Sequence, residues 1–160
     1  MASDLFIKIG DIKGESQDDK HRDEIEVLSW NWGLNQPGSI GSGGGGGMGK
    51  VSFSDLTFSH HVDKATPNLM KACATGQHIK EAKMTIRKSG KKPQEYLIVI
   101  MSDIVITRVE PSGQSGEAGT SEIVSLRFGK VDLEYKPQKA DGSLDAGIHF
   151  KYDIKLNKEG

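Results

Sequence analysis

Residues 44–50 of this sequence, Gly-Gly-Gly-Gly-Met-Gly-Lys, match the first part of a phosphate-binding loop, G-x-x-x-x-G-K. That chemistry needs a Ser or Thr after the lysine for magnesium and a helix whose N-terminus faces the phosphates. Here Val51 follows Lys50, and the alternation beyond it predicts a strand. Five consecutive glycines also satisfy almost any glycine pattern. We therefore interpret residues 35–49 as an extended Gly-rich contact loop without nucleotide chemistry.

A metal site is the second chemistry that the residue types allow. His60, His61 and Asp63 are close in sequence, but adjacent residues on a strand point to opposite faces. Only His61 and Asp63 would then lie together, whereas a metal site needs at least three protein ligands. We expect these residues to be polar groups at a strand end, with no metal and no cofactor.

Nucleophilic catalysis has little support in this sequence. No G-x-S-x-G motif is present, and Cys73 falls on an apolar stripe, which is a poor setting for a reactive thiolate. The one basic cluster, Arg87, Lys88, Lys91 and Lys92, is predicted to be a solvated hairpin, with contact to a protein partner as the alternative. The chain is therefore predicted not to be an enzyme.

Composition predicts one domain spanning residues 1–160. Lys plus Arg number 21 against 22 Asp plus Glu, which removes the electrostatic case for nucleic acid or an anionic membrane as partner. No run approaches 18 apolar residues, so membrane insertion is not expected. The first residues lack the basic region and apolar run of a signal peptide. We expect the protein to be made and folded in the cytoplasm.

One stretch, 66–76, predicts a helix. Thr66 is a predicted N-cap, Pro67 fits the first helical position, and Gly76 can adopt the left-handed conformation that ends a helix. Leu69, Met70 and Cys73 give one apolar stripe.

The rest of the chain alternates as strands do. A second strand over 24–34 places Ser29 and Asn31 on a small polar face toward water. Its other face carries Leu28, Trp30, Trp32 and Leu34 and is predicted to be buried in a core or an interface. Residues 11–23 read as a solvated polar loop.

Further strands are predicted over 5–9, 51–60, 82–87, 96–101, 104–109, 124–135 and 148–156. The run 96–101 is apolar enough to be covered on both faces, and an irregularity is expected at 102–103. A shift of parity between Phe128 and Val131 predicts a β-bulge at 129–130. About seven antiparallel strands indicate a mainly β barrel or two packed sheets with one helix.

Five segments of the chain carry a resemblance to a known family. They are Phe6–Ser16 (FIKIGDIKGES), Trp30–Gly33 (WNWG), the glycine run, Ala65–Met70 (ATPNLM) and Tyr135–Gly142 (YKPQKADG). In order and spacing they resemble the haemolysin-coregulated proteins (Hcp), which form the inner tube of the bacterial type VI secretion system. The resemblance covers most of the chain, from Leu5 to about Leu156.

This resemblance implies a compact two-sheet β-barrel with one flanking helix, similar to phage tail-tube proteins. It implies homo-hexameric rings that stack into a tube, with effector proteins in the ring lumen and the sheath and spike or baseplate proteins as further partners. Export through the apparatus itself would need no signal peptide.

On this basis we expect Ser29 and Asn31 to line the channel and contact effectors, while Trp30 and Trp32 pack into protein. Ring stacking is expected to involve the loop residues Gly38, Ser39, Ile40, Gly43, Gly47 and Met48. The alternative is a monomeric β-barrel module that binds a small ligand or a peptide.

Overall fold

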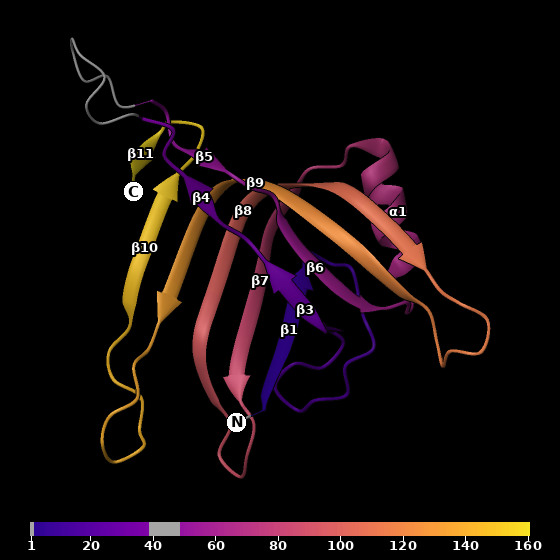
Figure 1. The fold of residues 1–160 in the computed structure, drawn as a ribbon, viewed down its shortest axis with the longest axis horizontal. Helices are drawn as coiled ribbons and strands as arrows, with labels where there is room; N and C mark the ends of the chain where they lie inside the picture. Colours follow the sequence, from indigo (N-terminus) through magenta and orange to yellow (C-terminus); the bar gives the residue numbers. More distant parts are fainter. Residues whose placement is uncertain (1, 39–48) are drawn as a thin grey trace.

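The computed structural model describes residues 2–38 and 49–160 (Figure 1). Within them lie one helix, α1 (Thr66–Thr75), and eleven strands. These are β1 (Ser3–Ile9), β2 (Ile25–Glu26), β3 (Ser29–Asn31), β4 (Leu34–Asn35), β5 (Ser52–Phe53), β6 (Leu56–His61), β7 (Ile79–Lys88), β8 (Gln94–Ser112), β9 (Ser121–Tyr135), β10 (Ile148–Asp153) and β11 (Lys158–Glu159).

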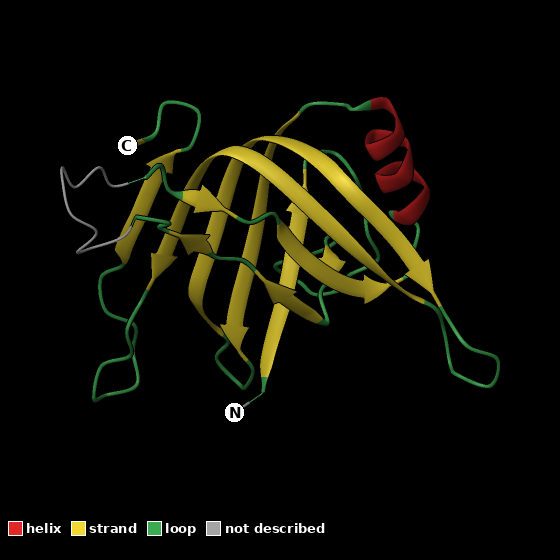
Figure 2. Cartoon of the chain, turned by 45° about the horizontal axis from the view of Figure 1, so that its top comes forward, coloured by secondary structure: helices red, strands yellow, loops and turns green. Residues whose placement is uncertain are grey.

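The long strands β7, β8 and β9 form the centre of one antiparallel sheet, whose order is β11-β10-β9-β8-β7-β1-β2. Strand β9 pairs with β8 along most of its length. Its other edge is shared, because β6 pairs with residues 121–126 and β10 with residues 130–135. The sheet therefore divides at β9, and β6 carries β3 with it. The resulting curvature is visible in Figure 2.

Residues 25–31 explain why the predicted second strand is not one element. Its first part pairs with β1, where the Val27 amide donates to the Leu5 carbonyl at 2.9 Å. Its next part pairs with β6, where the Leu28 amide donates to the Ser59 carbonyl at 2.8 Å. The chain changes partner at this point and breaks into β2, β3 and β4.

The predicted fold class, mainly antiparallel β with one helix, is confirmed. The second sheet is only the β4–β5 pair, and no closure of the barrel is detected in the part of the chain that the structure describes. Strand alternation buries one face of the large sheet. Its fully buried side chains include Ile7, Ile9, Leu56, Phe58, Met84, Val99, Met101, Ile104 and Leu126. Burying each of these contributes about 1.5–3 kcal/mol.

The parity shift near Gly129 has a different cause from the one predicted. Met101 lies opposite Val131, and Ile104 lies opposite Phe128. In each strand, two residues instead of one separate these buried positions. Both strands therefore shift their alternation at the same level, and the register between them is unchanged. Asp103 has a left-handed φ of 61° there, which confirms the irregularity at 102–103. A one-strand bulge at 129–130 is wrong, because the register shift lies between Ile106 and Arg108.

The helix ends as predicted, with Gly76 at φ 65°. Its start differs: Ala65 is the N-cap and no side chain caps the first turn. The Thr66 hydroxyl instead donates to the carboxylate of Glu122 at 2.9 Å. Leu69 and Ala72 are buried against the sheet, whereas Met70 is 38% exposed. The predicted stripe is therefore correct at Leu69 and wrong at Met70.

Three strand predictions need smaller corrections. The predicted strand 51–60 is interrupted between β5 and β6, and β10 ends at Asp153, three residues before the predicted end. The turn beyond it leaves Leu156 63% exposed. In β8, Val99 is buried while Ile98 and Ile100 are half-buried, so this strand is fully covered on one face only.

Candidate functional site: a small polar face and an exposed strand edge

Strands β3, β6 and β9 present a surface of small neutral side chains, which we call the Ser/Thr face: Ser29, Asn31, Thr57, Ser59 and Ser125. In β6 the side chains of Leu56, Phe58 and His60 point into the core, so Thr57 and Ser59 point outward. The hydroxyls of Ser29 and Ser59 lie 2.6 Å apart, and those of Thr57 and Ser125 lie 2.8 Å apart.

The structure places Ser29 and Asn31 together on this face, and both are exposed. Asn31 lies opposite Thr57 in the β3–β6 register. Side chains of this kind offer hydrogen bonds and little apolar area. The face can thus contact a passing polypeptide without holding it by hydrophobic burial.

Charged groups beside the Ser/Thr face are paired with one another. The Arg127 guanidinium donates to Asp55 at 3.0 Å, and the Thr107 hydroxyl donates to the same carboxylate at 2.8 Å. Arg108 donates to Glu110 at 2.6 Å, and this hydrogen bond lowers the pKa of Glu110. The surroundings of the face are therefore close to neutral.

Trp30 and Trp32 pack against the core as half-buried side chains. The Trp32 ring is stacked on Phe53 with centroids 6.0 Å apart and is tilted against Phe128 at 5.8 Å. Burial of the whole predicted face is wrong, however, because Leu28 and Leu34 are each 52% exposed. They lie where the chain breaks between short strands, so a single alternation does not extend over 24–34.

Among the predicted stacking residues, Gly38 lies at the end of the described segment, where its amide donates to the Gln36 side chain at 3.1 Å. Ser39, Ile40, Gly43, Gly47 and Met48 lie outside the described residues. The β4–β5 pair, with Leu34 opposite Phe53, brings the chain segments on either side of the Gly-rich stretch together.

Strand β10 forms an incompletely paired edge of the large sheet. Strand β11 covers it only at Tyr152 and Asp153, and the Gly160 amide reaches the Lys151 carbonyl. At the other end of β10, Ile148 is 66% exposed and lies opposite Tyr135, which is 46% exposed. On the side of β10 away from β9, no strand among the described residues pairs with this end. An open strand edge with exposed apolar side chains favours association with another chain.

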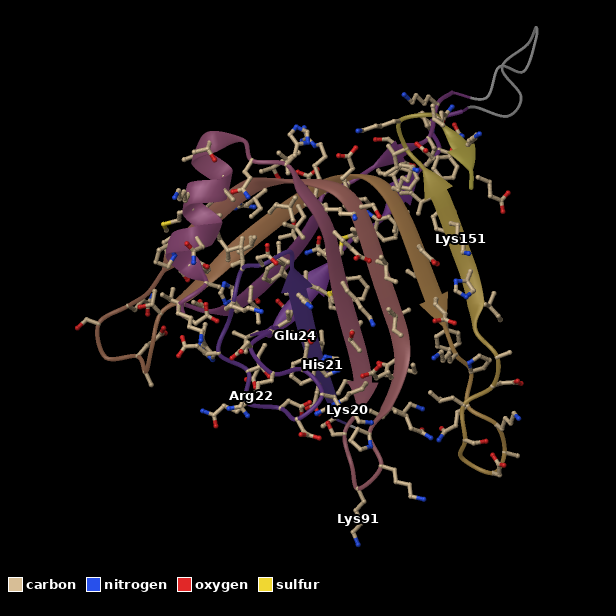
Figure 3. All side chains as sticks on the ribbon, turned by 180° about the vertical axis from the view of Figure 1, so that it is seen from behind. Lys20, His21, Arg22, Glu24, Lys91 and Lys151 are labelled. Carbon is tan, nitrogen blue, oxygen red and sulfur yellow. The ribbon has the colours of Figure 1, made fainter. Side chains whose placement is uncertain are left out.

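The predicted solvated loop 11–23 is in fact fixed on the sheet, through His21 (Figure 3). Its ring is 6% exposed, is stacked on Phe6 with centroids 4.5 Å apart, and lies between the carboxylates of Glu24 (2.9 Å) and Glu95 (2.8 Å). In the sequence, the large apolar side chain of Phe6 on the outer face of β1 was the one indication that the loop 11–23 covers this face.

Arg87 holds the same loop and is 7% exposed. It donates to Asp18 at 2.9 Å and to Asp4 at 3.3 Å. Its hydrogen bond lowers the pKa of Asp18, while burial acts in the opposite direction. The prediction of a solvated basic hairpin is therefore wrong for Arg87.

Comparison with known proteins identifies the family. The sequence profile described as "Type VI secretion system effector, Hcp" matches residues 6–135. Protein hcp1 of Pseudomonas aeruginosa is 50% identical over 159 residues, which is 98% of each chain. This chain belongs to the Hcp family. The crystal structure of Hcp1 from Salmonella typhimurium is 43% identical, with a TM-score of 0.79 and 99% of each chain covered.

The fold is also that of another solved protein, "Structure of a type six secretion system protein", with a TM-score of 0.93, 28% identity, and 99% of this chain and 100% of that chain covered. Hcp proteins are secreted tube proteins of the type VI system and are not enzymes, which confirms both the family resemblance and the non-enzyme prediction. In the described part of the chain, α1 is too short and too polar to cross a bilayer.

Neither the phosphate-binding loop nor the metal site finds support among the described residues of this Hcp chain. Strand β5 follows Lys50, and the next described helix starts only at Thr66, so the helix that a phosphate-binding loop requires is missing there. No group of three or more His, Cys, Asp or Glu side chains within 2–38 and 49–160 is arranged for a metal.

His60 contributes to stability through a network that sequence reasoning missed. It is fully buried, and its Nε2 lies 2.7 Å from Glu122, which is 1% exposed. Thr66 donates to the same carboxylate oxygen, so this network joins β6 and β9 to the start of α1. Asp63 lies 3.9 Å from His60, and burial raises its pKa. Glu122 is 62 positions from His60 and 56 from Thr66 along the chain, beyond the reach of any local pattern.

Proposed function

We propose that this chain forms hexameric rings that stack into the inner tube of a type VI secretion system, and that the ring lumen binds and carries effector proteins. A contractile sheath would expel the tube, with the spike and baseplate proteins as further partners. The family membership over 98% of the chain supports the tube assignment. The exposed ends of the molecule support the ring, and the Ser/Thr face supports the binding of effectors in its lumen.

The observation that carries the ring proposal is the placement of exposed apolar groups at opposite ends of the molecule. Ile148 and Tyr135 mark the β10 edge, while Val62 beyond β6 and Met70 on α1 are 41% and 38% exposed. Strand β10 and helix α1 lie at opposite ends of the long axis (Figure 1). A closed ring needs two different surfaces on each subunit that meet head to tail. The β10 edge of one subunit would therefore pack beside α1 of the next.

The Ser/Thr face is our candidate for the channel wall. Its side chains are small and neutral, Ser29 and Asn31 are exposed, and the neighbouring charges are already paired. A wall of this kind can hold a folded effector by several hydrogen bonds and still release it, because each such bond contributes only about 1 kcal/mol net.

Asn31→Trp is expected to leave rings intact and to reduce effector retention strongly. The indole would project from the Ser/Thr face into the channel and displace cargo sterically, without touching either exposed end. Retention is measured as the protein that co-purifies with rings from the native cell, quantified by mass spectrometry.

Gln114→Trp, on the exposed turn between β8 and β9, is the matched control and should retain cargo normally. Loss of rings in Asn31→Trp would contradict the channel assignment, as would unchanged cargo.

We assign ring-on-ring contacts to residues 38–49. The side chains of such a Gly-rich sequence are too small to form a core within one subunit, which suits it to contacts with a neighbouring ring. Removal of residues 39–48 is expected to leave single rings and abolish tubes in electron micrographs. Tubes of normal length from that variant would rule the assignment out.

A further inference from the structure

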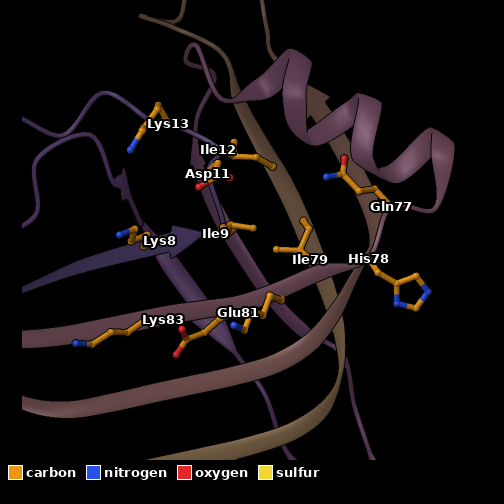
Figure 4. A pocket seen from close by; sticks show the side chains of 12 residues that line it. Lys8, Ile9, Asp11, Ile12, Lys13, Gln77, His78, Ile79, Glu81 and Lys83 are labelled. Atoms are coloured by element: carbon orange, nitrogen blue, oxygen red, sulfur yellow. The ribbon is translucent and has the colours of Figure 1, made fainter.

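A groove lies where β1 ends beside the start of β7 (Figure 4). Its volume is about 570 Å³, and its walls are residues 8–13, 77–81 and 83. Gly10 fixes its shape: φ is +48°, its amide donates to the Glu81 carbonyl at 3.0 Å, and a Cβ there would lie 2.8 Å from the Ile79 side chain. We call this the lysine groove.

Four lysines and two carboxylates line this groove: Lys8, Lys13, Lys80, Lys83, Asp11 and Glu81. All six side chains are exposed. None of them makes an ion pair within 4.0 Å with another described residue, whereas Asp55, Asp18 and Glu110 elsewhere on the sheet all pair with arginines. The lysine groove thus keeps an excess of free positive charge in a chain whose net charge is −1.

The backbone register makes this excess of positive charge unfavourable for the stability of the sheet. Lys8 lies directly opposite Lys83 in the β1–β7 pair, and like charges directly opposite one another destabilise a sheet. Both side chains lie on the side of the sheet that faces away from the core, because their neighbours Ile7, Ile9, Ala82 and Met84 are buried. A local arrangement that opposes folding is expected where a surface serves another purpose.

The apolar residues of the groove narrow the chemistry of its partner. Ile9 and Ile79 belong to the buried core, whereas Ile12 is half-buried, so Ile12 offers an apolar surface beside the lysines. Asp11 and Glu81 would repel a ligand that is anionic along its whole length, such as nucleic acid. A polypeptide with carboxylates and one apolar side chain can satisfy both features.

From this combination we infer that the lysine groove docks an acidic segment of a partner protein, with carboxylates toward Lys8 and Lys83 and an apolar side chain against Ile12. This interaction surface is separate from the ring contacts and the channel wall. It stands whether or not the proposed ring forms.

The test uses the full chain and a fluorescent twelve-residue peptide of Glu and Leu, with binding followed by anisotropy. We expect saturable binding that weakens as salt rises, and a loss of about tenfold in affinity for Lys8→Glu/Lys83→Glu. The matched control is Lys91→Glu/Lys92→Glu, which changes the net charge equally; Lys91 lies at the tip of the β7–β8 loop (Figure 3) and the control should bind as the parent does.

Equal losses in the two double variants would show unspecific attraction and overturn the inference. So would the absence of saturable binding, or tighter binding of single-stranded DNA than of the peptide. A second measurement tests the charge conflict without any partner: Lys83→Gln is expected to raise the Tm of the free chain by about 2 °C. A lowered Tm would contradict the repulsion between Lys8 and Lys83.

Discussion

We expect Ile148→Asp to abolish ring assembly and to leave a folded monomer. Ile148 is 66% exposed and lies opposite Tyr135, at the end of β10 whose outer edge has no partner strand among the described residues, so a charge there does not disturb the core. In an assembled ring the same carboxylate would be buried without a partner. Loss of about 2 kcal/mol at each contact lowers its equilibrium constant roughly 30-fold, and a closed ring repeats that loss at every interface. The measurement is mass in solution by light scattering, with circular dichroism to confirm the fold.

Leu34→Asp is the matched control. Leu34 is an aliphatic side chain that is 52% exposed, as Ile148 is exposed, but it belongs to β4 and not to the β10 edge. Its rings should remain. Ile148→Asp rings of normal mass would exclude the β10 edge from the interface, and an unfolded Ile148→Asp chain would show that this position supports the fold itself.

Glu122→Ala is expected to lower the free energy of unfolding by about 3–5 kcal/mol, since it removes one member of a buried network and leaves the others without a partner. His60 and Thr66 both bond to the same Glu122 oxygen, and all three side chains are buried. Urea unfolding followed by circular dichroism measures the change.

Glu117→Ala on the exposed β8–β9 turn should change the unfolding free energy by less than about 0.5 kcal/mol. The paired replacement His60→Leu/Glu122→Leu is expected to recover most of the loss, because two apolar groups need no hydrogen-bond partners. If Glu122→Ala matched the Glu117 control, the network would contribute little to the fold. Should Glu122→Ala fail to fold, the paired variant still decides the question.

The strands that local patterns predicted are those that keep one partner over many residues. Strand β1 and the β7–β8 hairpin alternate regularly, and their buried positions follow that alternation. The region 24–34 also alternates, but its partners change from β1 to β6 to β5. Periodicity reports the side-chain direction and not the identity of the neighbouring strand. The exposure of Leu28 and Leu34 therefore could not be predicted.

Networks formed by long-range pairs were also invisible in the sequence. His21 meets Glu95 across 74 positions, and Arg87 meets Asp18 across 69. A run of mixed charges has the same composition whether it is solvated or fixed on a sheet. The loop 11–23 was for this reason predicted as solvated, and only the large side chain of Phe6 indicated that something covers the outer face of β1.

Part of the candidate site followed directly from sequence. Ser29 and Asn31 are two residues apart on one strand, which is sufficient to place them on one face. Their neighbours on that face, Thr57, Ser59 and Ser125, come from β6 and β9 and required the register. The exposed end of β10 likewise depends on where β11 stops pairing. The roles of these surfaces in the ring remain proposals that assembly experiments address.

Assembly of this Hcp chain into six-membered rings can be tested in solution. We would measure the mass of the purified full chain by light scattering and record negative-stain images of the same sample. We predict a particle of six chains, each of 17.4 kDa, seen as rings with an open centre. A stable monomer at high concentration would contradict the ring, and would favour a monomeric binding module that shares only the fold.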